Sequence, residues 1–272
     1  MGMDRTVLGA AGLALSLNLA AASMKLDYQW AVVLLFGGML VFWAKTAWGG
    51  LERSEWKLFA GFFAVANLLT LVLELLMMRF RVWSFGDRTY HLTGWTILGA
   101  PLEEFEYWAG CAAIVPLSYL VLARRLKPAT VQPAFLAKVV KLASELHIQA
   151  RTDSTDYVEE NIGEVGQFSA GSRFPVYICV QLALLAAIIA LVRRYHGSWR
   201  ALMGATLCFF LVAFPNEFYS IHMDFWTYNS QRMLGIYFLG IPLEAWLMYY
   251  LPAVLACMVL DVADRRFFGK DA

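Results

Sequence analysis

Charged side chains are scarce in this sequence, and their scarcity excludes most soluble proteins. Only 16% of the 272 residues are charged, whereas 60% are hydrophobic. A soluble globular domain has about 25% charged and about 45–50% apolar residues. The formal net charge of +1 gives no support to a nucleic-acid partner. We therefore expect an integral membrane protein surrounded by membrane lipids.

Motifs for metals and redox cofactors are also missing. The four cysteines (Cys111, Cys179, Cys208 and Cys257) form no C-x-x-C pair and fall in apolar runs, which predicts buried free thiols. The four histidines are scattered, so no metal site is predicted. No G-x-G-x-x-G fingerprint stands at a strand-to-helix turn, so nothing in the sequence favours a flavin or a nicotinamide cofactor.

Long hydrophobic runs are what the sequence does contain. About 20 mostly apolar residues cross a hydrocarbon core of about 30 Å. The runs predict an all-α fold, a polytopic membrane helical bundle of about seven spans. The run at 200–219 is the weakest, because its end contains Pro215 followed by the polar Asn216 and Glu217. The candidate spans are 6–24, 29–48, 56–79, 98–123, 174–193, 200–219 and 235–260.

Two distant stretches share the same landmarks in the same order. In the first, the triplet Trp-Ser-Phe at 83–85 precedes Leu-Gly-Ala-Pro-Leu-Glu at 98–103. In the second, Trp-Thr-Tyr at 226–228 precedes Leu-Gly-Ile-Pro-Leu-Glu at 239–244. Each copy is predicted to be a unit of three helices. An odd number of spans in a unit predicts two copies in inverted orientation.

The repeat divides the chain into four segments. Residues 1–28 form an additional N-terminal span, expected to be a retained span because the region before it is barely basic and further spans follow. Residues 29–123 and 174–272 are the two repeats. The polar insertion at 124–173 contains an amphipathic pattern from Pro133 to Ala150, typical either of a helix in the membrane interface or of a loop helix covering the bundle.

Several carboxylates are predicted to lie inside the membrane. A charged side chain there costs about 2.5–3.5 kcal/mol on insertion scales, so it needs a reason to be present. Glu74 ends the third span, and Glu103 and Glu104 begin the fourth, so the three are expected to form one cluster. Glu217 and Glu244 would be the matching pair of the second copy. Such crowding can supply both an acid and an anion. The alternative is that these side chains only cap helices or pair with nearby arginines.

Aromatic side chains surround these acids. Some belong to the aromatic belt of any membrane protein. The sharper hypothesis uses their π faces, which attract cations such as a carbocation intermediate. Pro101 and Pro242 are predicted to begin helices. The candidate substrate-binding residues are Trp83, Tyr107, Trp108, Trp226, Tyr228, Pro101 and Pro242.

This duplicated pattern of Trp-x-aromatic, Leu-Gly and Pro-Leu-Glu resembles the membrane-integral lycopene cyclase family of some bacteria, archaea and fungi. That family has two homologous domains, either fused or as separate subunits. The resemblance covers roughly residues 30–123 and 174–260. It maps the acidic motif of the family onto Pro101, Glu103 and Glu104, and onto Pro242 and Glu244. Ala245 stands where a second glutamate is usual. This departure indicates that one copy performs the chemistry, and it leaves room for a different reaction such as hydration.

The resemblance implies an enzyme of the intramolecular lyase or isomerase class. It would protonate an end of a lycopene-type carotenoid and close it into a β-ionone-type ring, with no redox change and no cofactor. The substrate would be a lipophilic carotenoid taken from the bilayer, and the location a bacterial cytoplasmic membrane. A homo-oligomer stays open. So do two other functions: a proton-coupled membrane transporter, which inverted repeats with intramembrane carboxylates also describe, and a non-catalytic membrane subunit. In the inverted arrangement, basic residues divide almost evenly between the two membrane faces.

Overall fold

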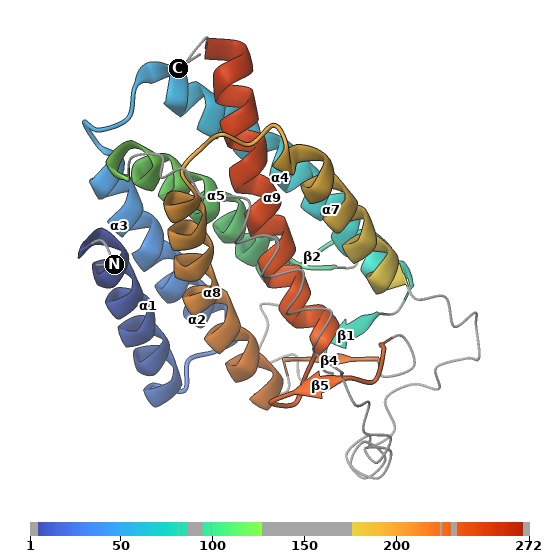
Figure 1. Cartoon of the computed structure of the whole chain (residues 1–272). Coiled ribbons are helices and arrows are strands. Elements are labelled where there is room, and N and C mark those ends of the chain that lie inside the picture. Colours follow the sequence, from blue (N-terminus) through green and yellow to red (C-terminus); the bar gives the residue numbers. More distant parts are fainter. Residues whose placement is uncertain are drawn as a thin grey trace, which may run out of the picture.

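A computed structural model describes residues 5–80, 82–85, 95–98, 100–126, 176–223, 225–229 and 233–268. Within these ranges the fold is the predicted all-α bundle, whose helices lie side by side (Figure 1). Most of the polar insertion, including the amphipathic pattern at 133–150, lies outside the described residues. The helices are α1 (Arg5–Ser23), α2 (Tyr28–Val32), the π-helical turn η1 (Val33–Gly37), α3 (Gly38–Ala47), α4 (Arg53–Arg79), α5 (Leu102–Arg125), α7 (Val176–Val192), α8 (Trp199–His222) and α9 (Leu243–Phe268).

Six helical segments of the described chain are long and apolar enough to cross a membrane. One of them, Tyr28–Ala47, combines α2, η1 and α3. The described part of α7 has 17 residues, slightly short of a full span. The weakest run of the sequence proves to be part of α8, a continuous helix of 24 residues that contains Pro215. These segments correspond to the seven expected spans.

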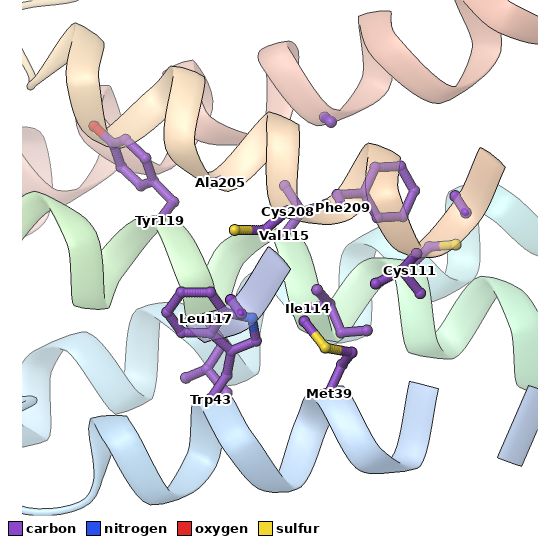
Figure 2. Close-up of a cluster of buried hydrophobic side chains, with 14 of the residues drawn as sticks. Met39, Trp43, Cys111, Ile114, Val115, Leu117, Tyr119, Ala205, Cys208 and Phe209 are labelled. Atoms are coloured by element: carbon purple, nitrogen blue, oxygen red, sulfur yellow. The ribbon is translucent and has the colours of Figure 1, made fainter. Parts of the chain in front are cut away.

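The core lies along α5, where α3 and α8 pack against it from two sides. Figure 2 shows Met39 and Trp43 of α3 meeting α5, while Ala205, Cys208 and Phe209 of α8 approach it from the other side. Close packing also explains Gly110 of α5, because a Cβ atom there would collide with Phe36 of the π-helical turn.

The prediction of four buried thiols is wrong for one cysteine. Cys111, Cys208 and Cys257 are buried, whereas Cys179 on α7 is exposed. An apolar run marks a residue as compatible with lipid, but it does not say which face of the helix points into the protein.

Short strands connect the helices at one end of the bundle. The strand β1 (Trp83–Phe85) follows α4, and β4 (Trp226–Tyr228) follows α8; the two pair antiparallel across the repeats. Each copy then forms a small hairpin, β2 (Thr96–Ile97) with β3 (Ala100–Pro101) and β5 (Tyr237–Phe238) with β6 (Ile241–Pro242). The second hairpin turns at Leu239 and Gly240, with φ angles of 52° and 76°, and Leu98 of the first has φ 53°. Two positive φ angles are typical of the type I′ turns that close two-residue hairpins.

The prediction of inverted repeats is wrong. Because β1 pairs with β4, the ends of α4 and α8 lie at the same end of the bundle, and α5 and α9 both begin there. The two copies therefore run in the same direction, related by an approximate two-fold axis along the helices. The prediction assumed that the insertion between the copies begins and ends on one face. Instead Arg124, before it, contacts Glu55 at the start of α4, whereas Tyr177, after it, packs with Met77 near the end of α4.

Candidate active site

Each hairpin delivers a glutamate to the first turn of a helix. Pro101 and Pro242 end the hairpins, and α5 and α9 begin at the next residue. Proline suits this position because the first amide groups of a helix have no partner within the helix. Glu103, Glu104 and Glu244 therefore lie in first turns, where the helix dipole favours a carboxylate.

Glu217, near the end of α8, is fully buried and accepts three side-chain hydrogen bonds. Its Oε1 accepts from Nε1 of Trp226 at 3.1 Å and from the hydroxyl of Tyr228 at 2.6 Å. Its Oε2 accepts from the hydroxyl of Tyr249 on α9. Burial, and then the neighbouring Glu217 carboxylate, raise the pKa of the Tyr228 hydroxyl well above its usual range. Tyr228 therefore stays protonated and remains a donor.

Glu104 on α5 is held by a residue that the sequence analysis missed. The hydroxyl of Tyr28, which is fully buried at the start of α2, donates to Oε1 of Glu104 at 3.0 Å. The ring of Tyr28 also meets that of Trp226 edge to face, with centroids 5.0 Å apart. A lone tyrosine at the start of a span gives no signal in the sequence, since tyrosine is common at that depth.

Glu104 and Glu217 meet at one small cavity, although they come from different copies. Its volume of about 30 Å³ has room for about one water molecule. The sequence predicts a different pair, Glu217 with Glu244 of the same copy, but Glu244 is not among the described lining residues. The described residues that line the cavity are Glu104, Tyr107, Trp108, Tyr177, Glu217, Trp226, Tyr228, Met248 and Tyr249.

The other predicted carboxylates lie near this cavity but are not among its described lining residues. Glu74 is buried and accepts a hydrogen bond from Nε1 of Trp108 at 3.2 Å. Glu103 and Glu244 are fully buried, and Oε1 of Glu244 accepts from the backbone amide of Leu234. Ala245, which replaces the second glutamate in the second copy, is fully buried.

Four of the seven predicted substrate-binding residues line the cavity: Tyr107, Trp108, Trp226 and Tyr228. Pro101 and Pro242 are buried in the hairpins, which position the helices. Only the backbone of Trp83 is described, in its pairing with Tyr228. Four of the predicted residues therefore line the cavity, and the other three belong to the short strands that connect the helices.

A second, larger cavity of about 320 Å³ adjoins the first, and we name it the apolar channel. It lies between α4, α5, α7, α8 and α9. Trp108 and Met248 line both cavities, so the two lie next to each other at these side chains. Within the described ranges, no group of three His, Cys, Asp or Glu side chains is arranged to hold a metal ion. The site therefore combines two carboxylates, several hydroxyl and indole donors, and an adjacent hydrocarbon-lined space.

Comparison with known proteins gives one match. A family model described as Lycopene cyclase matches residues 28–122 and 175–262, which together make up more than half of the chain. These regions contain both hairpins, Tyr28 and all the described residues that line the small cavity. The match leaves out α1 and the insertion. No curated protein and no solved structure matches the chain.

Proposed function

Because the chain belongs to the lycopene cyclase family, we propose that it closes the ψ-ends of lycopene, or of a related acyclic carotenoid, into β-ionone-type rings. The observation that carries this proposal is the convergence of Glu104 and Glu217 on one cavity that adjoins the apolar channel. The family makes the protein a cyclase of carotenoids in general terms. The reaction route and the ring type are the proposal.

The proposed reaction is an isomerisation started by a proton. A carboxylic acid donates its proton to the terminal carbon–carbon double bond, which leaves a carbocation. A second double bond of the same chain attacks this cation, and the new carbon–carbon bond closes the ring. A carboxylate then removes one ring proton, whose bonding electrons form the ring double bond. One proton is added and one is lost, so the product is an isomer of the substrate and no redox partner is needed.

We assign the acid to Glu104 and the base to Glu217. Three donors surround Glu217, and each of them stabilises a carboxylate, the form that a base needs. Glu104 has one donor, Tyr28, among the described residues, and that bond steadies the carboxylate left after proton donation. A water molecule in the small cavity would return the proton from Glu217 to Glu104 and complete the cycle.

The aromatic lining suits the cationic intermediate. The faces of Tyr107, Trp108 and Trp226 can stabilise a nearby positive charge without forming a bond to it. Because the pKa of Tyr228 is raised, its hydroxyl stays neutral and does not become a phenolate that could attack the cation.

Hydration is the second candidate, and the small cavity favours it. A water molecule beside the carboxylates could capture the cation before ring closure. The product would then carry a hydroxyl group and exceed the substrate by the mass of one water. Cyclisation and hydration are therefore separated by a single mass measurement.

The test is pigment analysis of bacteria that accumulate lycopene and express this chain alone. We expect cyclic products of unchanged mass from the wild type and none from Glu104→Gln. Glu52→Gln is the matched control, because Glu52 is an exposed carboxylate that pairs with Arg124, remote from the cavity. Unchanged lycopene from well-inserted wild-type protein would contradict the cyclase and favour a transporter or a non-catalytic subunit.

A further inference from the structure

We propose that the apolar channel binds the hydrocarbon chain of the substrate end-first, so that one end of the molecule reacts at each binding event. The inference rests on the proposed function for the identity of the ligand, a linear polyene hydrocarbon. Beyond the proposed function, it assigns a binding site for the polyene chain and the direction in which the chain enters. It also limits the reaction to one end of the polyene at a time.

The channel is elongated, and one of its ends adjoins the carboxylate cavity. It is lined from Phe62 to Leu73 on α4 and from Met248 to Val259 on α9. At 1.5 Å per residue, each stretch is about 16 Å long. The two helices run in opposite directions (Figure 1). Leu73 packs against the cluster that contains Met248, and Met248 also lines the carboxylate cavity, so both lie at the end next to the carboxylates.

The lining selects a hydrocarbon. Among the described lining residues there is no charged side chain. The one hydroxyl group, that of Thr70, already donates to backbone oxygens of its own helix at Ala66 and Asn67, at 2.9 and 3.0 Å. A polar ligand would lose its hydrogen bonds to water and find few replacements in this channel. A polyene has no such bonds to lose.

The side of the channel opens toward the surroundings of the bundle. Val65 and Leu69 of α4 line the channel, yet 58% and 63% of their surface is exposed. Within a membrane this exposed surface faces lipid, so a hydrocarbon can pass sideways into the channel from the bilayer. The carboxylate cavity adjoins the channel at one end, so a polyene that lies along the channel presents one of its two ends to the carboxylates.

The first experiment measures binding without requiring activity. A linear isoprenoid hydrocarbon with a diazirine group is photo-crosslinked to the purified full chain in lipid nanodiscs, and the modified peptides are identified by mass spectrometry. We expect crosslinks in the channel-lining parts of α4 and α9, and excess lycopene should remove them. Glu104→Gln should retain them, since it alters the reacting group and leaves the channel intact.

Plugging the channel tests its location. Ala112 of α5 lines the channel and is buried, whereas Ala186 of α7 is exposed. Ala112→Phe should reduce crosslinking and ring formation at least about tenfold, while Ala186→Phe should leave both unchanged. Ala256→Phe, on the opposite wall, replaces Ala112→Phe if that variant does not fold. Crosslinking that survives both plugs would overturn the channel.

The outcomes separate this inference from the proposed function. Plug-sensitive crosslinks without ring formation would support the channel and contradict the cyclase. Rings formed at the wild-type rate by a plugged variant would support the cyclase and overturn the channel. Bicyclic product without any free monocyclic intermediate, even in short reactions, would overturn the one-end limit.

A separate observation assigns the orientation in the membrane, and we infer that the carboxylate cavity lies in the half of the bilayer away from the cytoplasm. With the repeats running in the same direction, the basic residues within the described ranges no longer divide evenly. We call the end of the bundle that contains the two hairpins the hairpin end. Of the described lysines and arginines, only Lys25 and Arg79 lie there. The opposite end has eleven: Arg5, Lys45, Arg53, Lys57, Arg124, Arg125, Arg193, Arg194, Arg200, Arg265 and Arg266.

Contacts between helices confirm that these ends belong together. Arg124 pairs with Glu52 and Glu55, and Arg125 donates to Thr6 of α1. Arg265 donates to the backbone oxygen of Arg194. Because positively charged segments remain in the cytoplasm, the basic end is the cytoplasmic one.

Cysteine labelling tests this orientation. In a chain without its native cysteines, Ser23→Cys probes the hairpin end and Lys57→Cys the basic end; both residues are exposed. A membrane-impermeant maleimide should label Ser23→Cys in intact cells and Lys57→Cys only after permeabilisation. The reverse pattern would overturn the assignment.

Discussion

The two repeats share a backbone but differ where chemistry is expected. In the second copy, Glu217 accepts hydrogen bonds from Trp226, Tyr228 and Tyr249. In the first, the equivalent Glu74 accepts from Trp108, which occupies the position of Tyr249. The first copy supplies Glu104, and the second has Ala245 at that place. The first copy thus keeps both carboxylate positions, as Glu74 and Glu104, and the second keeps only Glu217. The small cavity combines Glu104 of the first copy with Glu217 of the second.

The largest expected effect comes from the two equivalent glutamates. Glu217→Gln should lower the rate of ring formation at least about 100-fold, because it removes the proposed base. Glu74→Gln should lower it less than about tenfold, because Glu74 is not among the described lining residues of the cavity. Rates are measured in membranes and normalised to inserted protein. Equal losses in the two variants would contradict the asymmetry.

Restoring the missing glutamate should damage the fold. Ala245 is fully buried, so Ala245→Glu forces a larger, polar carboxyl group into the packed interior, and its desolvation is costly. We expect a clear drop in the midpoint of thermal unfolding in detergent, with Ala245→Ser as the control of small volume. A variant as stable as the wild type would mean that the two copies still accept the same residue.

A smaller effect should come from removing one of the donors that hold Glu217 in the second copy. Tyr249→Phe removes one charge-assisted hydrogen bond to Glu217, worth about 1.5–3 kcal/mol, and should lower the rate about tenfold or more. Tyr250→Phe is the neighbouring control. It removes a hydroxyl from a tyrosine outside the described cavity lining and should leave the rate within a factor of two. Equal effects of the two substitutions would remove Tyr249 from the site.

The smallest effect should be the same in both copies. Leu98 and Leu239 both have positive φ angles, which cost a side chain of this type about 1–2 kcal/mol relative to a right-handed helical conformation. Leu98→Asn and Leu239→Asn should each raise the free energy of unfolding by up to about 1 kcal/mol, as measured by denaturant titration in detergent. Opposite signs would show that the hairpins are not equivalent.

The fold was largely predictable because lipid restricts a spanning chain to helices. Every backbone group must find its partner inside the span, so long apolar runs indicate helices. Even the weak run around Pro215 follows this rule, since α8 continues through it. The direction of the second copy was not predictable. It depends on how residues 124–173 connect the repeats, and an amphipathic pattern there does not report a side of the membrane.

The residues of the site were easier to predict than which two carboxylates meet in it. A buried glutamate is costly wherever it lies, so Glu104 and Glu217 could be selected from the sequence. Their meeting depends on the packing of α5 against α8, which hydropathy does not encode. Tyr28 was missed for the same reason, because it reaches Glu104 from a helix far away in the sequence.

The pairing of β1 with β4 has a consequence for the history of the molecule. Trp83 lies opposite Tyr228, and Phe85 lies opposite Trp226, so each strand meets its own counterpart in reverse. This is the isologous contact that two identical chains make around a two-fold axis. A homodimer with this contact would have two identical pockets. After fusion into one polypeptide the two copies are free to differ, and here Glu104 of the first copy has Ala245 as its counterpart in the second.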